Sequence, residues 1–345
     1  MILIRKNKQN NRKKHFRAGS IWFVAAGICV VVAGCSVDTV PISDTQIAYE
    51  ADSVSQPQNS ADVADTSEGG LLSGDVCIVP RKKNIATDAA ITADAALLID
   101  DSRKKVLYAQ NVYASEYPAS VSKIATALMA LKYSSLDDTV TIGYNASHIT
   151  EYGARLCGFQ EGDKISMKDL LYCMLTYSGN DAAMAIAEHI SGSEQEFAAK
   201  MNQEMIAIGA SGTHFVNSHG LHDDDHYTTA YDLYLIFHEL LKYDDFCEII
   251  QSTKYTAAWT NAEGKKQTLD IVSSEPYLTG SRQLPKGMSV VGGKSGTTVK
   301  AGSCMILYTQ DKKKRDYISV ILKADSSYSL NTQMDHLLEY VKRGK

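Results

Sequence analysis

The segment Pro118-Ala119-Ser120-Val121-Ser122-Lys123-Ile124 places a proline, a serine and a lysine at the start of an apolar run. Apolar residues recur at helical spacing as far as Leu131, which predicts a helix over residues 121–134. Because proline is favoured just outside a helix start, Ser120 is expected at the N-terminus of this helix. Lys123 follows one turn later, so its amine is predicted to reach the Ser120 hydroxyl.

This pairing suits nucleophilic catalysis. A serine hydroxyl is a poor nucleophile unless a base lies beside it. Lys123 can be that base only as a neutral amine, and burial together with a second nearby cation would lower its pKa. Free backbone N–H groups at the helix start would help to bind an oxyanion that develops at Ser120. On its own, the segment also fits an ordinary helix cap.

Two further motifs follow in order, Ser178-Gly179-Asn180 and Lys294-Ser295-Gly296. Lys294 is the expected second cation beside Lys123, and the glycines around it suit a backbone that a substrate approaches closely. Taken singly, each motif also fits a surface turn. The three motifs in this order form a combination that chance seldom gives.

Together the motifs supply a candidate active site. Ser178 is expected to pass a proton to the leaving group, and Asn180 to hold the lysine and the substrate amide. The hydroxyl groups that follow Lys294 are expected to bind a substrate carboxylate. The candidate catalytic residues are Ser120, Lys123, Ser178 and Asn180, and the candidate substrate-binding residues are Lys294, Ser295, Gly296, Thr297 and Thr298.

The pattern resembles that of the low-molecular-mass penicillin-binding proteins that act as serine-type D-alanyl-D-alanine carboxypeptidases. The resemblance runs over residues 93–322. Besides the three motifs, it includes residues 95–100, 181–183, 201–202, 220–221, 228–232 and 301–304. One departure is Ser295, where the family more often has threonine; because the hydroxyl is retained, function is expected to survive with looser carboxylate binding.

The resemblance implies an acyl-enzyme reaction. Ser120 would be acylated, Lys123 would be its general base, and the backbone N–H groups of Ser120 and Thr297 would form the oxyanion hole. The substrates would be peptidoglycan stem peptides, and β-lactams would act as inhibitors. Neither a cofactor nor a metal is implied.

Two alternative functions stay open at this point. A class A β-lactamase deacylates with a glutamate that acts through a water. The Glu-x-x-Leu-Asn pattern that carries this glutamate is absent between Asp181 and Lys294. A non-catalytic lipoprotein that binds wall peptides or β-lactams is the other alternative, although a decayed site would be expected to lose at least one of the motif residues.

A cluster of histidines and aspartates over residues 219–226 invites comparison with a metal site. His222 and His226 are one helical turn apart. Gly220 and the run of aspartates indicate a loop instead, with the next helix starting near Thr229. We therefore interpret the cluster as a solvated loop without a metal.

The N-terminus has the layout of a lipoprotein signal. A basic segment is followed by a short apolar run, over residues 21–34, that is too short to span a membrane comfortably. The run ends in Val32-Ala33-Gly34-Cys35, which resembles a lipobox. Residues 1–34 are thus predicted to be a signal peptide, and Cys35 to carry the lipid. An uncleaved anchor or ordinary signal cleavage is the alternative.

Residues 35–75 are rich in serine and aspartate with few large apolar residues, so they are predicted to be a disordered tether. Residues 76–345 are predicted to be the catalytic domain. Family members often attach through a C-terminal helix after a second domain. Because this chain ends at Lys345, the lipid is expected to replace that anchor and to hold the protein outside the cell membrane.

Composition adds further limits. The formal net charge is −5, and removal of the basic signal makes the remainder more acidic, so nucleic-acid binding is not indicated. Two of the seven cysteines precede residue 36, which leaves an odd number beyond. Cys304 lies in an apolar strand and is expected to be a buried hydrophobic residue.

Strand patterns occur at both ends of the predicted domain. Residues 95–100 and 105–109 predict one hairpin, and residues 303–309 and 317–323 predict a second. Helical patterns dominate residues 167–243, and a last amphipathic helix follows residue 330. This order predicts an α+β fold in which an antiparallel sheet is flanked by helices and carries a helical insert, as in the β-lactamase and transpeptidase superfamily. Lys294 is expected on a strand that faces Ser120.

Overall fold

The computed structural model describes residues 75–80 and 84–343. The chain divides into two units, Met1–Asp65 and Thr66–Lys345, and all the described residues belong to the second. The predicted signal peptide, the predicted lipidation site Cys35 and residues 35–74 of the predicted tether lie outside the described residues.

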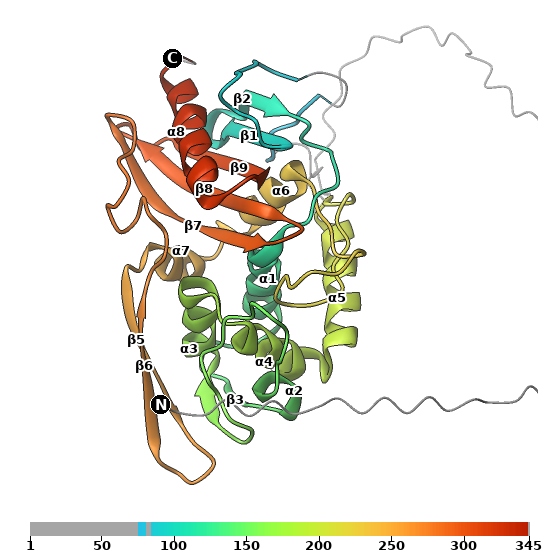
Figure 1. Ribbon diagram of the computed structural model, residues 1–345. Coiled ribbons are helices and arrows are strands. Elements are labelled where there is room, and N and C mark those ends of the chain that lie inside the picture. The colour runs from blue at the N-terminus through green and yellow to red at the C-terminus, as the bar shows by residue number, and fades with distance from the viewer. Residues whose placement is uncertain (1–74, 81–83, 344–345) are drawn as a thin grey trace, which may run out of the picture. The chain divides into compact units, whose positions relative to one another are not determined.

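A five-stranded antiparallel sheet forms the centre of this unit, with the strand order β2-β1-β9-β8-β7 (Figure 1). Both predicted hairpins are confirmed, as β1 with β2 and as β8 with β9. The strand β9 pairs with β1, so the two hairpins are adjacent in the sheet although the helical part lies between them in the sequence. The strands are β1 (Ala95–Asp100), β2 (Lys105–Gln110), β7 (Met288–Thr298), β8 (Gly302–Asp311) and β9 (Asp316–Ala324).

Helices cover both faces of this sheet, because side chains along a strand alternate between its faces. Leu97 and Ile99 join the core that contains α1 (Lys123–Tyr133) and α6 (Ala230–Leu240). Leu98 points to the other face and packs with the apolar side of α8 (Ser327–Arg343). The predicted α+β class is confirmed.

A helical part with a second sheet is inserted between the two hairpins. It contains α2 (Tyr144–Ser147), α3 (Met167–Tyr172), a π-helical turn (Cys173–Tyr177), α4 (Asn180–Ser191), α5 (Glu194–Ala207) and α7 (Asp244–Gln251). Its sheet has the order β3-β4-β5-β6, formed by β3 (Thr139–Thr141), β4 (Lys164–Ser166), β5 (Lys254–Thr260) and β6 (Lys266–Val272). This sheet was not predicted. The strands β3 and β4 have three residues each and are too short to show a period, and β5 and β6, with seven residues each, bury only one residue each.

The predicted start of the first helix is corrected by two residues. The α-helix α1 begins at Lys123, and a 3-10 turn, η3 (Ala119–Ser122), precedes it and carries Ser120. The turn is tight because Ala119 enters it with a φ of 50°, in the left-handed region. The side chain of Ser122 donates a hydrogen bond to the Ala119 carbonyl at 2.8 Å and closes the turn.

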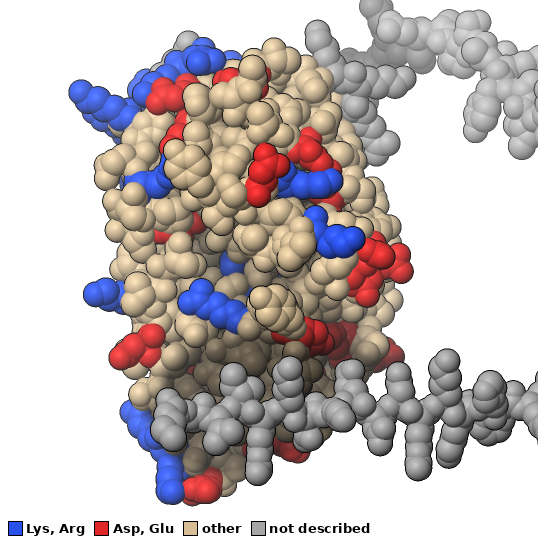
Figure 2. All heavy atoms as spheres, viewed as in Figure 1, with Lys and Arg blue, Asp and Glu red and all other residues tan. Residues whose placement is uncertain are grey.

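Acidic and basic side chains are interspersed on the face that Figure 2 shows. Among residues 75–80 and 84–343, no helix combines the length and the apolar composition needed to cross a bilayer.

Candidate active site

The three sequence motifs meet at one cleft. Ser120 comes from η3, Asn180 from the first turn of α4, and Thr297 from the end of β7. The cleft has a volume of about 590 Å³. Its lining residues are Ser120, Tyr152, Gly153, Arg155, Asn180, Gly220, Leu221, Thr297, Thr298, Val299, Gly302, Ser303, Asp325, Ser326 and Ser327.

Lys123 is fully buried beside Ser120. Its Nζ lies 3.0 Å from Ser120 Oγ, 2.7 Å from Asn180 Oδ1 and 2.7 Å from the carbonyl oxygen of His219. The predicted reach from the lysine to the serine hydroxyl and the predicted contact with Asn180 are confirmed. Burial, and next the charge of Lys294, hold the pKa of Lys123 well below its usual value.

The hydrogen-bond partners of Lys123 match the donors and the lone pair of a neutral amine. A neutral amine has two N–H donors and one lone pair, and neither Asn180 Oδ1 nor the His219 carbonyl oxygen can donate. Both N–H groups are therefore used on these two oxygens, and the lone pair is left for the Ser120 hydroxyl. The arrangement holds Lys123 as a base that can accept the serine proton.

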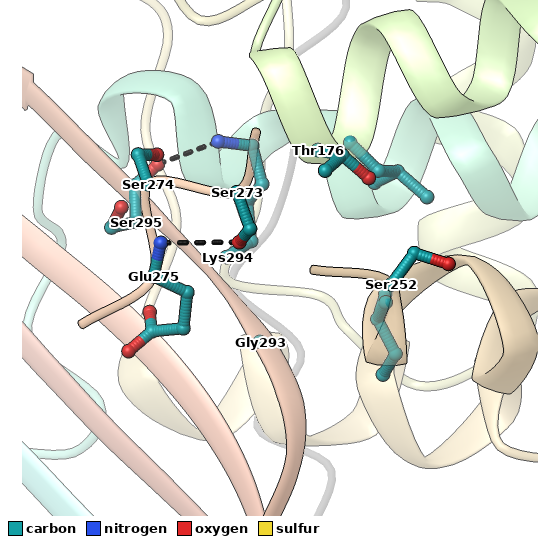
Figure 3. Close-up of a pocket in the computed structure, with 10 residues that line it drawn as sticks. Thr176, Ser252, Ser273, Ser274, Glu275, Gly293, Lys294 and Ser295 are labelled. Carbon is teal, nitrogen blue, oxygen red and sulfur yellow. Dashed lines mark hydrogen bonds between the residues drawn. The ribbon is translucent and has the colours of Figure 1, made fainter. Parts of the chain in front are cut away.

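Lys294 lies across the site on β7 and is also buried. Its Nζ donates to Ser178 Oγ at 3.0 Å and to the Ser295 carbonyl at 2.8 Å. Burial, and next the charge of Arg155, lower the pKa of Lys294 to about 7, against an opposing effect of Glu275. Lys294, Ser295 and Glu275 line a cavity of about 20 Å³ behind the strand (Figure 3).

Gly296 lets β7 approach Ser120 closely. A Cβ at this position would overlap the backbone nitrogen of Ser120 and stand 3.0 Å from its Cα. Gly220 plays the same part on the other side, where its φ is 83° and a Cβ would overlap the carbonyl oxygen of Ala119. The turn that carries Ser120 is thus held between two backbone segments without side chains.

The interpretation of residues 219–226 as a solvated loop is wrong in part. His226 is buried, and its Nε2 lies 2.7 Å from Ser122 Oγ, while its Nδ1 accepts from the Val216 N–H at 3.2 Å. Burial lowers the pKa of His226 to about 3, so the ring is neutral and Nε2 donates to the Ser122 hydroxyl. The loop therefore supports the η3 turn, and its carbonyl at His219 also binds Lys123.

Several residues of the site were missed by the sequence analysis. Arg155 lies in an irregular loop with no periodic pattern, and Glu275 lies 19 residues before Lys294 without any motif. Burial raises the pKa of Glu275 to about 7. The sequence shows only that these two residues are charged. Their closeness to Lys294 depends on the packing of segments that are distant along the chain, which no local pattern indicates.

The comparison with known families agrees with the motifs. The profile of the D-alanyl-D-alanine carboxypeptidase family, peptidase S11, matches residues 82–326. The chain belongs to the peptidase S11 family. It is 32% identical over 259 residues to the D-alanyl-D-alanine carboxypeptidase DacF of Bacillus subtilis, a match that covers 74% of this chain and 63% of that protein. The match therefore spans less than two thirds of the length of this relative.

Solved structures share the fold. The Streptomyces K15 DD-transpeptidase aligns with a TM-score of 0.68 at 24% identity, over 74% of this chain and 98% of the other. Penicillin-binding protein D2 of Listeria monocytogenes, in its ampicillin-bound form, aligns with a TM-score of 0.60 at 26% identity, over 74% of this chain and 99% of the other. These likenesses place the described unit in the penicillin-binding fold of the β-lactamase and transpeptidase superfamily.

Proposed function

We propose that this protein is a serine-type D-alanyl-D-alanine carboxypeptidase that removes the terminal D-alanine from peptidoglycan stem peptides. The contact that carries this proposal is the 3.0 Å separation of Lys123 Nζ and Ser120 Oγ. A buried neutral amine at hydrogen-bond distance gives the serine the base that it needs. Membership of peptidase S11 supports the substrate class.

The reaction follows from the positions of the side chains. Ser120 Oγ attacks the carbonyl of the penultimate D-alanine while its proton moves to Lys123 Nζ. The N–H groups of Ser120 and Thr297 stabilise the oxyanion. The C–N bond then breaks, and Ser178, which is linked to Lys294, relays a proton to the amine of the departing D-alanine. The proton held by Lys123 then returns to Lys294, and the neutral Lys123 accepts a proton from an attacking water. The water oxygen adds to the acyl carbon, the ester bond to Ser120 Oγ breaks, and Oγ takes this proton back from Lys123.

β-Lactams are expected to acylate the same serine, as the ampicillin-bound relative suggests. Among the described residues that line the cleft there is no glutamate that could activate a deacylating water. The penicilloyl enzyme should therefore persist. Rapid loss of this adduct would favour the β-lactamase alternative.

We also propose a localisation for the protein. The signal-like segment 1–34 and the lipobox-like Val32-Ala33-Gly34-Cys35 support a lipoprotein on the outer face of the cell membrane, with residues 35–75 as tether and 76–345 as catalytic domain. Cys35→Ala should move the protein from the membrane fraction to the soluble fraction. Retention of this variant in the membrane would refute lipid anchoring.

The decisive experiment measures D-alanine release from a diacetylated Lys-D-Ala-D-Ala peptide. Ser120→Ala should reduce the release by at least about 10³-fold because the nucleophile is lost. Ser289→Ala, an exposed serine of β7, is the control and should keep full activity. Stable labelling of Ser120 by a fluorescent penicillin without release would indicate the non-catalytic binding protein instead.

A further inference from the structure

Arg155 is a cation that lines the cleft. It lies between α2 and β4 and lines the cleft together with Ser120 and Asn180. Its side chain is exposed. Across the cleft stand the hydroxyl-bearing residues Thr297 and Thr298 at the end of β7.

The position of Arg155 is tied to the middle motif. Its guanidinium carbon lies 4.1 Å from the centroid of the Tyr177 ring, a stacking distance that favours a defined orientation of the side chain. Its backbone carbonyl accepts the N–H of Asn180 at 2.7 Å. The first contact orients the guanidinium against Tyr177, which precedes Ser178 in the chain, and the second fixes the Arg155 backbone against Asn180 of the middle motif.

The charge of Arg155 is not balanced within the described residues. No carboxylate of residues 75–80 and 84–343 lies within ion-pair distance of its guanidinium. Its charge instead acts on Lys294, whose pKa it lowers. The two cations are therefore close enough to repel one another, and an anion bound by both would relieve this repulsion.

We propose that Arg155 binds the terminal carboxylate of the substrate and makes the enzyme specific for a free C-terminus. This inference rests on the carboxypeptidase function proposed above. In a D-Ala-D-Ala peptide the carboxylate lies one residue beyond the bond that Ser120 attacks, which brings it close to the reacting atoms. A planar guanidinium can bind both carboxylate oxygens, whereas an internal peptide bond offers no charge there.

The opposite wall completes this carboxylate site. Lys294 and the hydroxyls of Thr297 and Thr298 belong to β7, while Arg155 belongs to the helical part. Bound carboxylate would contact both walls of the cleft and would favour the charged form of Lys294. The sequence-based assignment of the carboxylate to the β7 hydroxyls alone is thereby extended.

The test compares diacetyl-Lys-D-Ala-D-Ala with the same peptide as its C-terminal amide. The measured quantity is the ratio of kcat/KM for the acid to kcat/KM for the amide. Arg155→Ala should lower this ratio roughly 10- to 100-fold, the range for loss of a charge-assisted hydrogen bond. Arg155→Lys should recover part of it. Tyr152→Ala, an uncharged change in the same loop and cleft, should leave the ratio unchanged.

An unchanged ratio in Arg155→Ala would overturn the proposal. If the wild-type protein releases no D-alanine from the peptide, the carboxypeptidase function fails separately. The same variants are then compared in acylation by a penicillin and by its methyl ester. A fall in the acid-to-ester ratio of acylation rates in Arg155→Ala still supports a carboxylate site, and a constant ratio still overturns it.

Discussion

Two lysines with opposite tasks lie in the same site. In the proposed reaction Lys123 must be neutral to accept the proton of Ser120, whereas Lys294 acts best as a cation toward Ser178 and the substrate. Both are buried, and burial lowers both pKa values. The nearby carboxyl of Glu275 partly sustains the charge of Lys294. Environment thus separates two chemically identical side chains into a base and an electrostatic anchor.

This separation predicts a bell-shaped dependence of kcat/KM on pH. The rate should rise at acid pH as Lys123 loses its proton, and should fall as the pH passes about 7, where Lys294 loses its charge. Steady-state kinetics between pH 5 and 9 measure both limbs. Lys294→Arg keeps a charge throughout this range, so the alkaline limb should vanish; its survival would assign the limb to another group.

Gly296→Ala tests how closely β7 must approach the nucleophile. The added Cβ overlaps the Ser120 nitrogen, so η3 must shift, and a displacement of about 1 Å can cost about 10²-fold in rate. We expect a comparable fall in the rate of labelling by a fluorescent penicillin.

Gly192→Ala is the matched control for this substitution. Nothing lies within 4 Å of a Cβ there, but its φ is 79°, so the change should lower stability by about 1 kcal/mol without slowing the labelling. Labelling of Gly296→Ala at the wild-type rate would show that η3 tolerates the shift.

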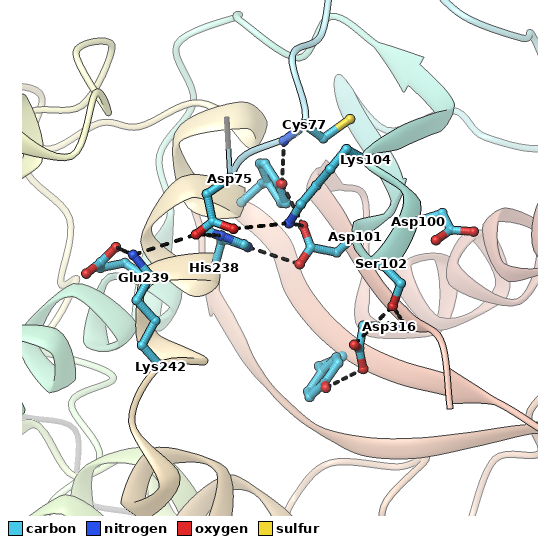
Figure 4. Close-up of polar contacts among 12 residues, drawn as sticks. Asp75, Cys77, Asp100, Asp101, Ser102, Lys104, His238, Glu239, Lys242 and Asp316 are labelled. Carbon is cyan, nitrogen blue, oxygen red and sulfur yellow. Dashed lines mark hydrogen bonds and ion pairs between the residues drawn. The ribbon is translucent and has the colours of Figure 1, made fainter. Parts of the chain in front are cut away.

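At the scale of elements, a histidine joins α6 to the first hairpin. His238 Nδ1 lies 3.0 Å from Asp101 in the turn between β1 and β2, and its Nε2 lies 3.3 Å from Asp75 (Figure 4). Lys104 approaches Asp101 at 3.3 Å and Lys242 approaches Asp75 at 3.9 Å. Three segments that are distant in the sequence therefore share one charged network.

The network predicts a pH-dependent stability. Burial lowers the pKa of His238, but the hydrogen bond and charge of Asp101 outweigh it, so the folded-state pKa is raised above 6.5. The protonated His238 ring therefore stabilises the fold fully at pH values below its pKa in the unfolded chain, about 6.5. This stabilisation is lost as the pH rises through the higher pKa of His238 in the folded protein.

The free energy of unfolding of the wild-type protein in urea should therefore exceed that of the His238→Gln variant. The difference between the two should be largest at about pH 6 and should shrink toward pH 9. His336→Gln, an exposed change on α8, should leave the pH dependence as it is. A constant difference between His238→Gln and the wild type at all pH values would contradict a role of the histidine charge.

At the scale of the molecule, the segment before the first strand belongs to the folded unit. Cys77 and Val79 are buried, and the Cys77 N–H donates to the Tyr234 hydroxyl at 2.8 Å. A chain that begins at Thr66 should unfold like the full chain. One that begins at Asn84 should lose about 3 kcal/mol, because a buried valine and a buried hydrogen bond are removed. Equal midpoints in urea for the two truncations would refute this dependence.

Part of the fold and of the site could be predicted from the sequence because the signals are local. The hairpins have clear alternation, and Lys123 is one helical turn from Ser120. The second sheet and the supporting role of His226 could not be predicted, because each depends on partners far away in the sequence.

The order of the motifs, the α+β class and the residue types available for acyl transfer could be read from the chain alone, since spacing and periodicity are properties of neighbouring residues. The packing of distant segments buries Lys123 and holds its pKa well below the usual value, lowers the pKa of Lys294 to about 7, and stacks Arg155 on the ring of Tyr177. The physical reason is that pKa values and unpaired charges depend on desolvation and on distances between segments, which are set only when the sheet and the helical part pack together.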